Sequence, residues 1–223
     1  MIARYLLLVI FLLCNLSCGQ HSNKETENVT AVATNSIEQT DIQENQSSSE
    51  QFSPFYVFQD KGSRENHFIP SGFMPDGKCV VVNEASTENC RDGKSCIKII
   101  FDVACANQNQ KWAGVYWQYP ANNWGQRKGG FNLTGAKKLV FWARGDKGGE
   151  QIQEFTIGGI MGTYPDSDMG TIGPVILTPD WREYTIDLRG KDLSYINGGF
   201  AWTTNSDVNP ESCIFYLDDM RFE

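Results

Sequence analysis

Aromatic and amide side chains gather in residues 111–130, KWAGVYWQYPANNWGQRKGG. Flat aromatic rings pack on the apolar faces of sugar rings, while amide and guanidinium groups hydrogen-bond to sugar hydroxyls. This stretch therefore predicts a site for a polysaccharide or an oligosaccharide. The candidate ligand-binding residues, taken from this stretch and from later segments, are Trp117, Tyr119, Asn122, Asn123, Trp124, Arg144, Tyr164, Trp202 and Asn205.

The first half of that stretch, residues 111–119, is typical of a β-strand because it is rich in aromatic and β-branched residues. On a strand, Val115, Trp117 and Tyr119 share one face, and Tyr116 takes the other. One of the two faces must enter a core. The following residues contain Pro and Gly and predict a long polar loop that carries the amide groups.

Short alternating runs of this kind recur along the chain, and no helical period is kept over ten residues. The pattern predicts an all-β sandwich of two sheets around one core. Leu217 and Met220 both look apolar and inward, but their odd spacing predicts a β-bulge at residues 218–219. We expect Trp112 and Trp142 in the core and Trp181 as a structural plug. The expected strands lie near residues 52–60, 79–83, 94–103, 111–119, 138–144, 152–157, 174–177, 181–188, 200–203 and 214–222.

The N-terminus predicts export. Residues 1–17 have a charged start and a short apolar run, as in a signal peptide. Residues 16–19, LSCG, resemble a bacterial lipoprotein cleavage box in which Cys18 would be acylated, although an ordinary secretory signal is the alternative. Residues 18–50 are polar and predict a disordered tether. The folded domain is then residues 51–223, held to the membrane of a bacterial cell envelope by a lipid anchor.

Charge and cysteine content limit the possible partners. The net charge of −8, with scattered basic residues, argues against nucleic acid, and we expect a monomer. An exported chain favours disulfides. Cys90 and Cys96 could close a small loop, Cys79 could pair with Cys105 or with Cys90, and the odd number of cysteines in the domain leaves at least one free thiol.

Three ordered segments resemble carbohydrate-binding modules with the jelly-roll, galactose-binding-like fold. They are LTGAKKLVFWARGD at residues 133–146, TPDWREYTIDLRG at residues 178–190 and IFYLDDMRFE at residues 214–223. The resemblance implies a jelly-roll β-sandwich and non-catalytic glycan binding. Because a fold hosts many functions, the sites themselves stay a matter of analogy.

The resemblance also implies a structural Ca²⁺. In such modules an aspartate in the closing strand binds the ion together with oxygens from a loop after the first strand, as a hard cation prefers. The alternative is that Asp218 or Asp219 caps backbone amides or pairs with Arg221 or Arg64. The candidate metal ligands are Asp60, Asn66, Asp218 and Asp219.

Two other functional classes stay open. A surface adhesin or scaffold would bind protein partners through its edge loops. A polysaccharide hydrolase needs two carboxylates across a cleft, and a jelly-roll lyase would use a set such as His67 with Tyr164 or Arg144. The candidate carboxylates are Glu150, Glu154, Asp166, Asp168 and Asp187.

Overall fold

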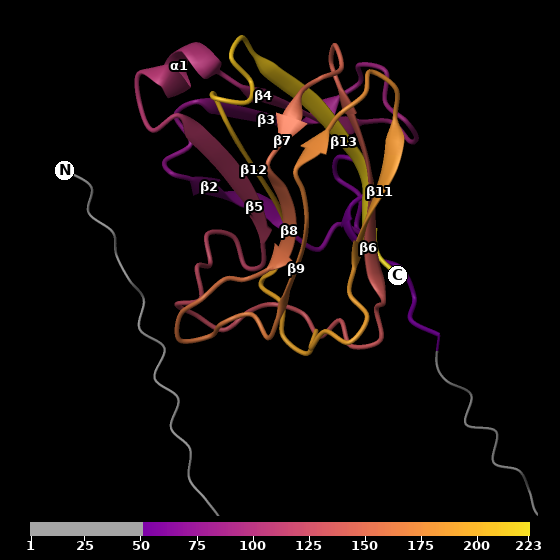
Figure 1. Ribbon diagram of the computed structural model, residues 1–223. Helices are drawn as coiled ribbons and strands as arrows, with labels where there is room; N and C mark the ends of the chain where they lie inside the picture. The colour runs from indigo at the N-terminus through magenta and orange to yellow at the C-terminus, as the bar shows by residue number, and fades with distance from the viewer. Residues whose placement is uncertain (1–50) are drawn as a thin grey trace, which may run out of the picture. The chain divides into compact units, whose positions relative to one another are not determined.

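The computed structural model describes residues 51–223 of the chain. The predicted signal peptide, the Cys18 lipidation site and the tether lie outside these residues. In the described part, two antiparallel sheets face each other (Figure 1), and we name them the β13 sheet and the β5 sheet.

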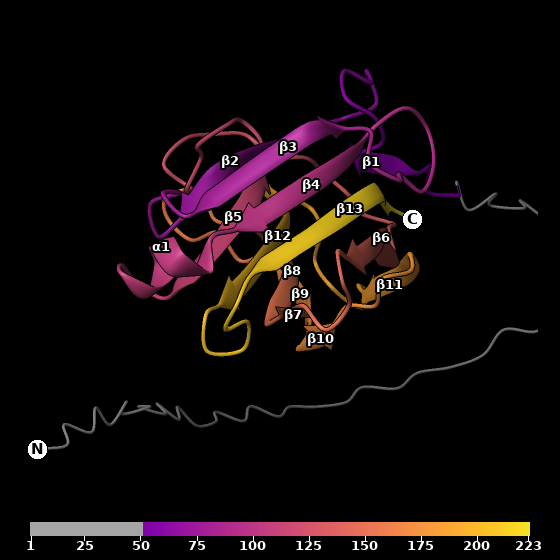
Figure 2. The same cartoon turned by 90° about the horizontal axis from the view of Figure 1, so that it is seen from above.

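The β13 sheet is built around the last strand of the chain, and Figure 2 shows β3, β4 and β13 side by side. Its spatial order is β11 (Arg182–Asp187), β6 (Lys138–Gly145), β13 (Cys213–Phe222), β4 (Cys96–Phe101) and β3 (Val80–Ser86), with β1 (Phe55–Phe58) also paired to β13. The order of the β5 sheet is β2 (Ile69–Met74), β5 (Trp112–Gln118), β12 (Gly198–Asn205), β8 (Glu154–Gly158) and β9 (Met169–Ile172). A separate short pair joins β7 (Gln151–Ile152) to β10 (Val175–Ile176).

Large aromatic side chains from both sheets form the core. Phe200 of β12 contacts Trp117 of β5 within its own sheet, with ring centroids 5.6 Å apart. Across the sandwich, Phe200 meets Phe141 of β6 at 5.1 Å, and Trp202 meets Phe215 of β13 at 5.1 Å. These contacts bury one face of each sheet, which confirms the predicted β-sandwich.

Three elements differ from the sequence expectation. Strands β2 and β9 lie in segments predicted as loops, because Pro70 and Gly72 interrupt the apolar pattern of β2 and its register shifts between them. A short helix, α1 (Val103–Asn107), begins where the side chain of Asp102 accepts the amide of Cys105 at 3.0 Å. This contact is a helix N-cap, which a search for long helical periods does not detect.

The predicted β-bulge in the closing strand is confirmed. The register between β13 and β6 shifts between Asp218 and Arg221, and Asp219 has a φ of 47°. Leu217 and Met220 are both buried despite their odd spacing. The extra residue thus keeps the apolar side chains on the core face of the strand.

The disulfides agree with two of the pairings left open by the sequence. Cys79 bonds to Cys105, and Cys90 bonds to Cys96. Cys213 is buried and forms no disulfide with the residues described here. Within residues 51–223, no helix has the length and apolar character that crossing a membrane requires.

Candidate functional site

The outer faces of the two sheets are covered to different extents. The segment between β3 and β4, residues 87–95, lies over the outer face of the β13 sheet, and the Cys90–Cys96 disulfide joins it to the start of β4. There Arg144 donates to the carbonyl of Glu88 at 3.2 Å, and the indole of Trp181 donates to the carbonyl of Asn89 at 2.9 Å. The guanidinium of Arg144 also lies 3.7 Å from the ring centre of Tyr216.

The outer face of the β5 sheet instead carries some exposed side chains, among them Trp112 and Met169, although Gln118, Ala201 and Thr156 are buried. In β5, Ala113, Val115 and Trp117 point to the core, so the alternate residues point outward. The strand register then fixes which side chains share the outer face. The outward residues at these paired positions are Trp112, Gly114, Tyr116 and Gln118 in β5, Ala201, Thr203 and Asn205 in β12, Glu154 and Thr156 in β8, and Met169 and Thr171 in β9.

An aromatic pair marks one end of this face. The ring of Trp124, from the loop after β5, meets the ring of Tyr116 edge-on at 5.7 Å. The hydroxyl of Tyr116 donates to the carbonyl of Gly158 at 3.0 Å. Burial raises the pKa of Tyr116 to about 12, and the carboxylates of Asp166 and Glu154 add to the effect. The phenol therefore stays protonated and fixed, with its ring available as a rigid surface.

A buried amide network holds the loop that carries Trp124. The side-chain amide of Asn123 donates to the carbonyl of Arg127 at 2.9 Å and to the side-chain oxygen of Asn197 at 3.1 Å. Asn197 in turn donates to the carbonyl of Tyr164 at 3.0 Å, and the Tyr164 amide donates to the carbonyl of Gly125 at 2.9 Å. The network joins the loops after β5 and β8, which gather at the end of the sandwich opposite α1 (Figure 1).

Asp166 anchors the second of these loops. Its carboxylate accepts the amide of Ile160 at 2.9 Å, the amide of Gly198 at 3.4 Å and the amide of Asn197. Burial raises the pKa of Asp166, while these backbone hydrogen bonds act in the opposite direction. Asp166 therefore has a structural role in this loop, because backbone amides already donate to its carboxylate oxygens.

Trp112 lies at the other end of the outer face of the β5 sheet, which we call the open face. Its side chain is 38% exposed and lies opposite Asn205 in the register. Between the two aromatic ends lies Gly114, where an added Cβ would come 2.8 Å from the Met74 methyl and 2.9 Å from the Thr203 methyl. The missing side chain lets Met74 and Thr203 close over the strand, so the floor between the rings is low and partly apolar.

Three of the candidate ligand residues are fully buried in the structure. Trp117 and Trp202 are both 0% exposed and pack in the core, so their prediction as ligand contacts is wrong. Asn123 is also 0% exposed and holds the loop from within. Trp112 is half-exposed rather than in the core, which reverses the expectation for that residue.

The remaining candidates are spread over different parts of the surface. Arg144 is only 6% exposed and lies on the other sheet, so its grouping with the aromatic loop is wrong. Tyr119 is exposed, but its ring packs on Phe131 at 4.5 Å beside that loop. Asn122 is exposed, Tyr164 is half-buried in the network, and Asn205 uses its side-chain oxygen to accept two turn amides at 3.0 and 3.1 Å. Of the nine candidates, Trp124 and Asn205 lie on or beside the open face.

Sequence reasoning missed Trp112 and Tyr116 as members of the exposed face. The available signal was the composition of the two alternate sets in β5. Ala113, Val115 and Trp117 form a purely apolar set, whereas the set containing Trp112 and Tyr116 also includes Gly and Gln. An apolar set belongs in the core, and a mixed set is typical of a face in contact with water.

The predicted metal residues come together, but their contacts do not fit a calcium site. Asp60, Asp218 and Asp219 line one cavity of about 540 Å³. Arg91 and Arg221 line it too, and both form ion pairs with Asp219. Among the described residues, no group of three His, Cys, Asp or Glu side chains is arranged to hold a metal.

The fourth predicted ligand, Asn66, is used within its own loop. Its side-chain oxygen accepts the amide of Gln59 at 2.8 Å, and its side-chain nitrogen donates to the carbonyl of Asp60 at 2.8 Å. Both polar atoms of the Asn66 side chain are therefore engaged. Unfolding measured with and without Ca²⁺ tests the predicted ion directly.

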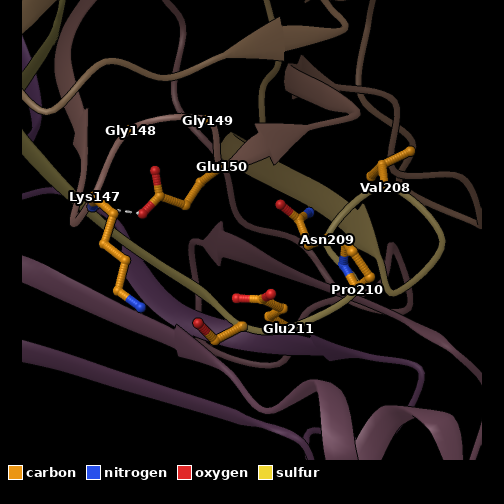
Figure 3. Close-up of a pocket in the computed structure, with 9 residues that line it drawn as sticks. Lys147, Gly148, Gly149, Glu150, Val208, Asn209, Pro210 and Glu211 are labelled. Carbon is orange, nitrogen blue, oxygen red and sulfur yellow. Dashed lines mark hydrogen bonds between the residues drawn. The ribbon is translucent and has the colours of Figure 1, made fainter.

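A second cavity, of about 210 Å³, lies between the β6–β7 turn and the β12–β13 turn (Figure 3). Its lining includes Lys147, Glu150, Asn209 and Glu211 but no aromatic side chain. One oxygen of the buried Glu150 carboxylate accepts the amide of Lys147 at 2.8 Å, and the other has no hydrogen-bond partner. Without an aromatic ring, this cavity lacks the stacking surface expected of a sugar site.

The structure is similar to solved carbohydrate-binding modules. A family 30 module matches with a TM-score of 0.51 and 13% identity, covering 77% of this chain and 88% of that chain. The family 30 module of a cellulosomal cellulase of Clostridium thermocellum matches with a TM-score of 0.49 and 15% identity, covering 77% and 97%. No family model matches the chain, and no curated protein matches it. At this identity the first likeness shows the fold alone, and it confirms the predicted jelly-roll β-sandwich.

Proposed function

We propose that this chain, which has the fold of a family 30 carbohydrate-binding module, binds a glycan without catalysis on the outer face of its β5 sheet. The observation that carries the proposal is the arrangement of one exposed and two partly buried rings on that face. Trp112 lies at one end, and the Tyr116–Trp124 pair lies at the other. Aromatic rings of this kind offer a flat apolar surface to a pyranose, and neighbouring polar side chains offer hydrogen bonds.

The spacing of the rings supports a polymer as the ligand. Trp112 and Tyr116 are four residues apart in β5, which is roughly 14 Å at the rise of a strand. This distance is longer than a single sugar ring, so a chain of several sugars would contact both ends. The proposed ligand is therefore a polysaccharide or an oligosaccharide rather than a monosaccharide.

The charges on this face support a neutral glycan. None of the outward residues at the paired positions of β5, β12, β8 and β9 is Lys or Arg. The one ionisable carboxylate among them is Glu154, whose side chain accepts the hydroxyl of Thr156 at 2.6 Å. A sulfated or uronate polymer would meet no positive charge there and would face Glu154 instead.

We further propose that the domain acts at the bacterial cell envelope as a monomer. Acylation of Cys18 would attach it to a membrane, and residues 18–50 would serve as the tether. These proposals rest on the sequence alone. Mass spectrometry of the protein from bacterial membranes would test them, because a diacylglycerol-modified Cys18 at the N-terminus is expected.

A glycan array followed by affinity electrophoresis tests the binding proposal. The purified chain from residue 19 onward is screened first, and the bound polysaccharide is then used with Trp112→Ala and Trp124→Ala. We expect each variant to bind about tenfold more weakly, which corresponds to about 1.4 kcal/mol. Val81→Ala is the matched control, because Val81 is an exposed apolar residue on the β13 sheet. That variant should bind as the wild type does.

Two outcomes would count against the proposal. If Trp112→Ala and Trp124→Ala both bind every array hit with wild-type affinity, the open face is not the glycan site. If a folded protein binds no glycan but captures a defined protein partner, the adhesin function replaces glycan binding. Cleavage of the polysaccharide on incubation with the protein would instead support the enzyme alternative.

A further inference from the structure

Three segments that are distant in the sequence meet at the cavity lined by the predicted metal residues. They are the loop after β1, the segment between β3 and β4 (residues 87–95) and the β-bulge of β13. In the resembling fold a structural divalent cation would join the first and third of these segments. Here the negative groups of the cavity already have donors, and each donor belongs to the protein.

Two carboxylates are satisfied by backbone amides of residues 91–95. Asp60 accepts the amides of Lys94 and Ser95 at 2.7 and 2.8 Å. Asp218 accepts the amides of Arg91 and Asp92 at 3.1 and 3.2 Å through one oxygen. Oriented amides of this kind stabilise an anion without a bound ion.

The third carboxylate is satisfied by guanidinium groups. Arg221 lies 2.5 Å from Asp219, and it also pairs with Glu223 at 2.6 Å. Arg91 lies 3.4 Å from Asp219, and its guanidinium stacks on the ring of Trp142 at 3.9 Å. Both arginines therefore have additional contacts that hold their charged ends beside Asp219.

We infer that Arg91 and Arg221 replace the structural divalent cation that this fold implies, so that the junction of the three segments is stabilised by guanidinium groups and backbone amides of the protein, without a bound ion. A guanidinium supplies several fixed donors to carboxylates, whereas a calcium ion needs those same oxygens as ligands. The two arrangements exclude each other. The stability of this domain should then be independent of calcium.

The inference also predicts that the domain can bind calcium once the two arginines are removed. If both guanidinium groups are removed, Asp219 and Asp92 lose their positive partners in an open cavity, and Glu223 keeps only its ion pair with Lys138. Hard oxygen ligands without cationic neighbours attract a divalent cation. The double variant Arg91→Met, Arg221→Met should therefore gain a response to calcium that the wild type lacks.

Thermal unfolding in calcium and in chelator tests both statements. The chain from residue 19 onward is melted in about 5 mM CaCl₂ and in excess EDTA. We expect the wild-type melting temperature to differ by less than about 1 °C between them. The double variant should melt at a lower temperature in EDTA and recover roughly 3–8 °C in calcium.

Arg189→Met is the matched control. It removes a guanidinium from a close carboxylate in the same way, but its partner Asp187 lies in an exposed pair on β11. Calcium should not change the melting temperature of this variant. If the double variant does not fold, Arg221→Met alone is used with the same comparison.

Each other outcome would overturn the inference. A wild-type melting temperature that falls in EDTA, or rises in calcium, would mean that the domain binds a structural ion despite the arginines. A folded double variant, or a folded Arg221→Met variant, with no calcium response would mean that the guanidinium groups do not occupy a cation position. If calcium raised the melting temperature of Arg189→Met as much as that of the double variant, the response would be a general effect of any carboxylate that has lost its arginine partner.

Discussion

Trp117 provides the sharpest test of which face of β5 enters the core. Its indole is fully buried, packs on Phe200 and makes no hydrogen bond through its nitrogen. Trp117→Ala would leave a large cavity, and substitutions of this size cost about 3–5 kcal/mol. For a domain of this size the melting temperature should fall by roughly 10 °C.

Two further variants isolate the cause of that loss. Trp117→Phe keeps a ring in the core and breaks no hydrogen bond, so it should cost roughly 1–2 kcal/mol. Trp112→Ala removes the half-exposed indole on the opposite face of the same strand and should cost about 1 kcal/mol or less. The ordering of the three variants, rather than any single value, identifies the buried ring.

Urea unfolding followed by circular dichroism measures these differences. The free energies are compared only if the slope of the unfolding transition stays constant among the variants. The reasoning would be refuted if Trp117→Ala cost less than Trp112→Ala. In that case the strand would present Trp117 to solvent, and the proposed glycan face would be the wrong one.

Two more predictions concern buried titratable groups. Burial raises the pKa of Asp218 to about 6, above its ordinary value of 3.8, so its contribution to stability is present at low pH and lost as pH rises through about 6. Asp218→Asn should remove about 1–2 kcal/mol of this pH dependence between about pH 4 and about pH 7, measured by urea unfolding, and an unchanged profile would contradict it. Burial, with the nearby Glu150, raises the pKa of the Cys213 thiol to about 12. The native protein should not react with a disulfide reagent at Cys213 and should react once unfolded in urea, whereas rapid native labelling would place the thiol at the surface.

Much of the fold could be predicted because strand alternation and the closing motif carry strong local signals. The bulge at residues 218–219 follows from the spacing of Leu217 and Met220 alone. Strand β2 could not be found in this way, because Pro70 and Gly72 resemble loop residues until β5 is placed beside them. Strand β2 forms because it pairs with β5, and a short stretch of sequence does not show which strands will pair.

The site was harder to predict than the fold. The sequence identified the right stretch, but local pattern left open which alternate set of β5 faces the core. Trp117 and Trp202 were chosen for their ring type, although a large ring serves a core as well as a ligand. Arg144 looked like a sugar-binding group, and only the placement of residues 87–95 shows that it is covered by a loop far away in the sequence.

Residues 87–95 cover the outer face of the β13 sheet, so substitutions on that face should affect stability more than substitutions on the outer face of the β5 sheet. On the covered face, a substitution at Trp142 or Arg144 disturbs ring contacts and hydrogen bonds that hold residues 87–95 in place. On the open face, a change at Met169 or Thr171 alters a surface that already meets solvent. Variants with new ligand preferences should therefore be easier to select on the β5 sheet, because stability does not limit its outward residues to the same degree.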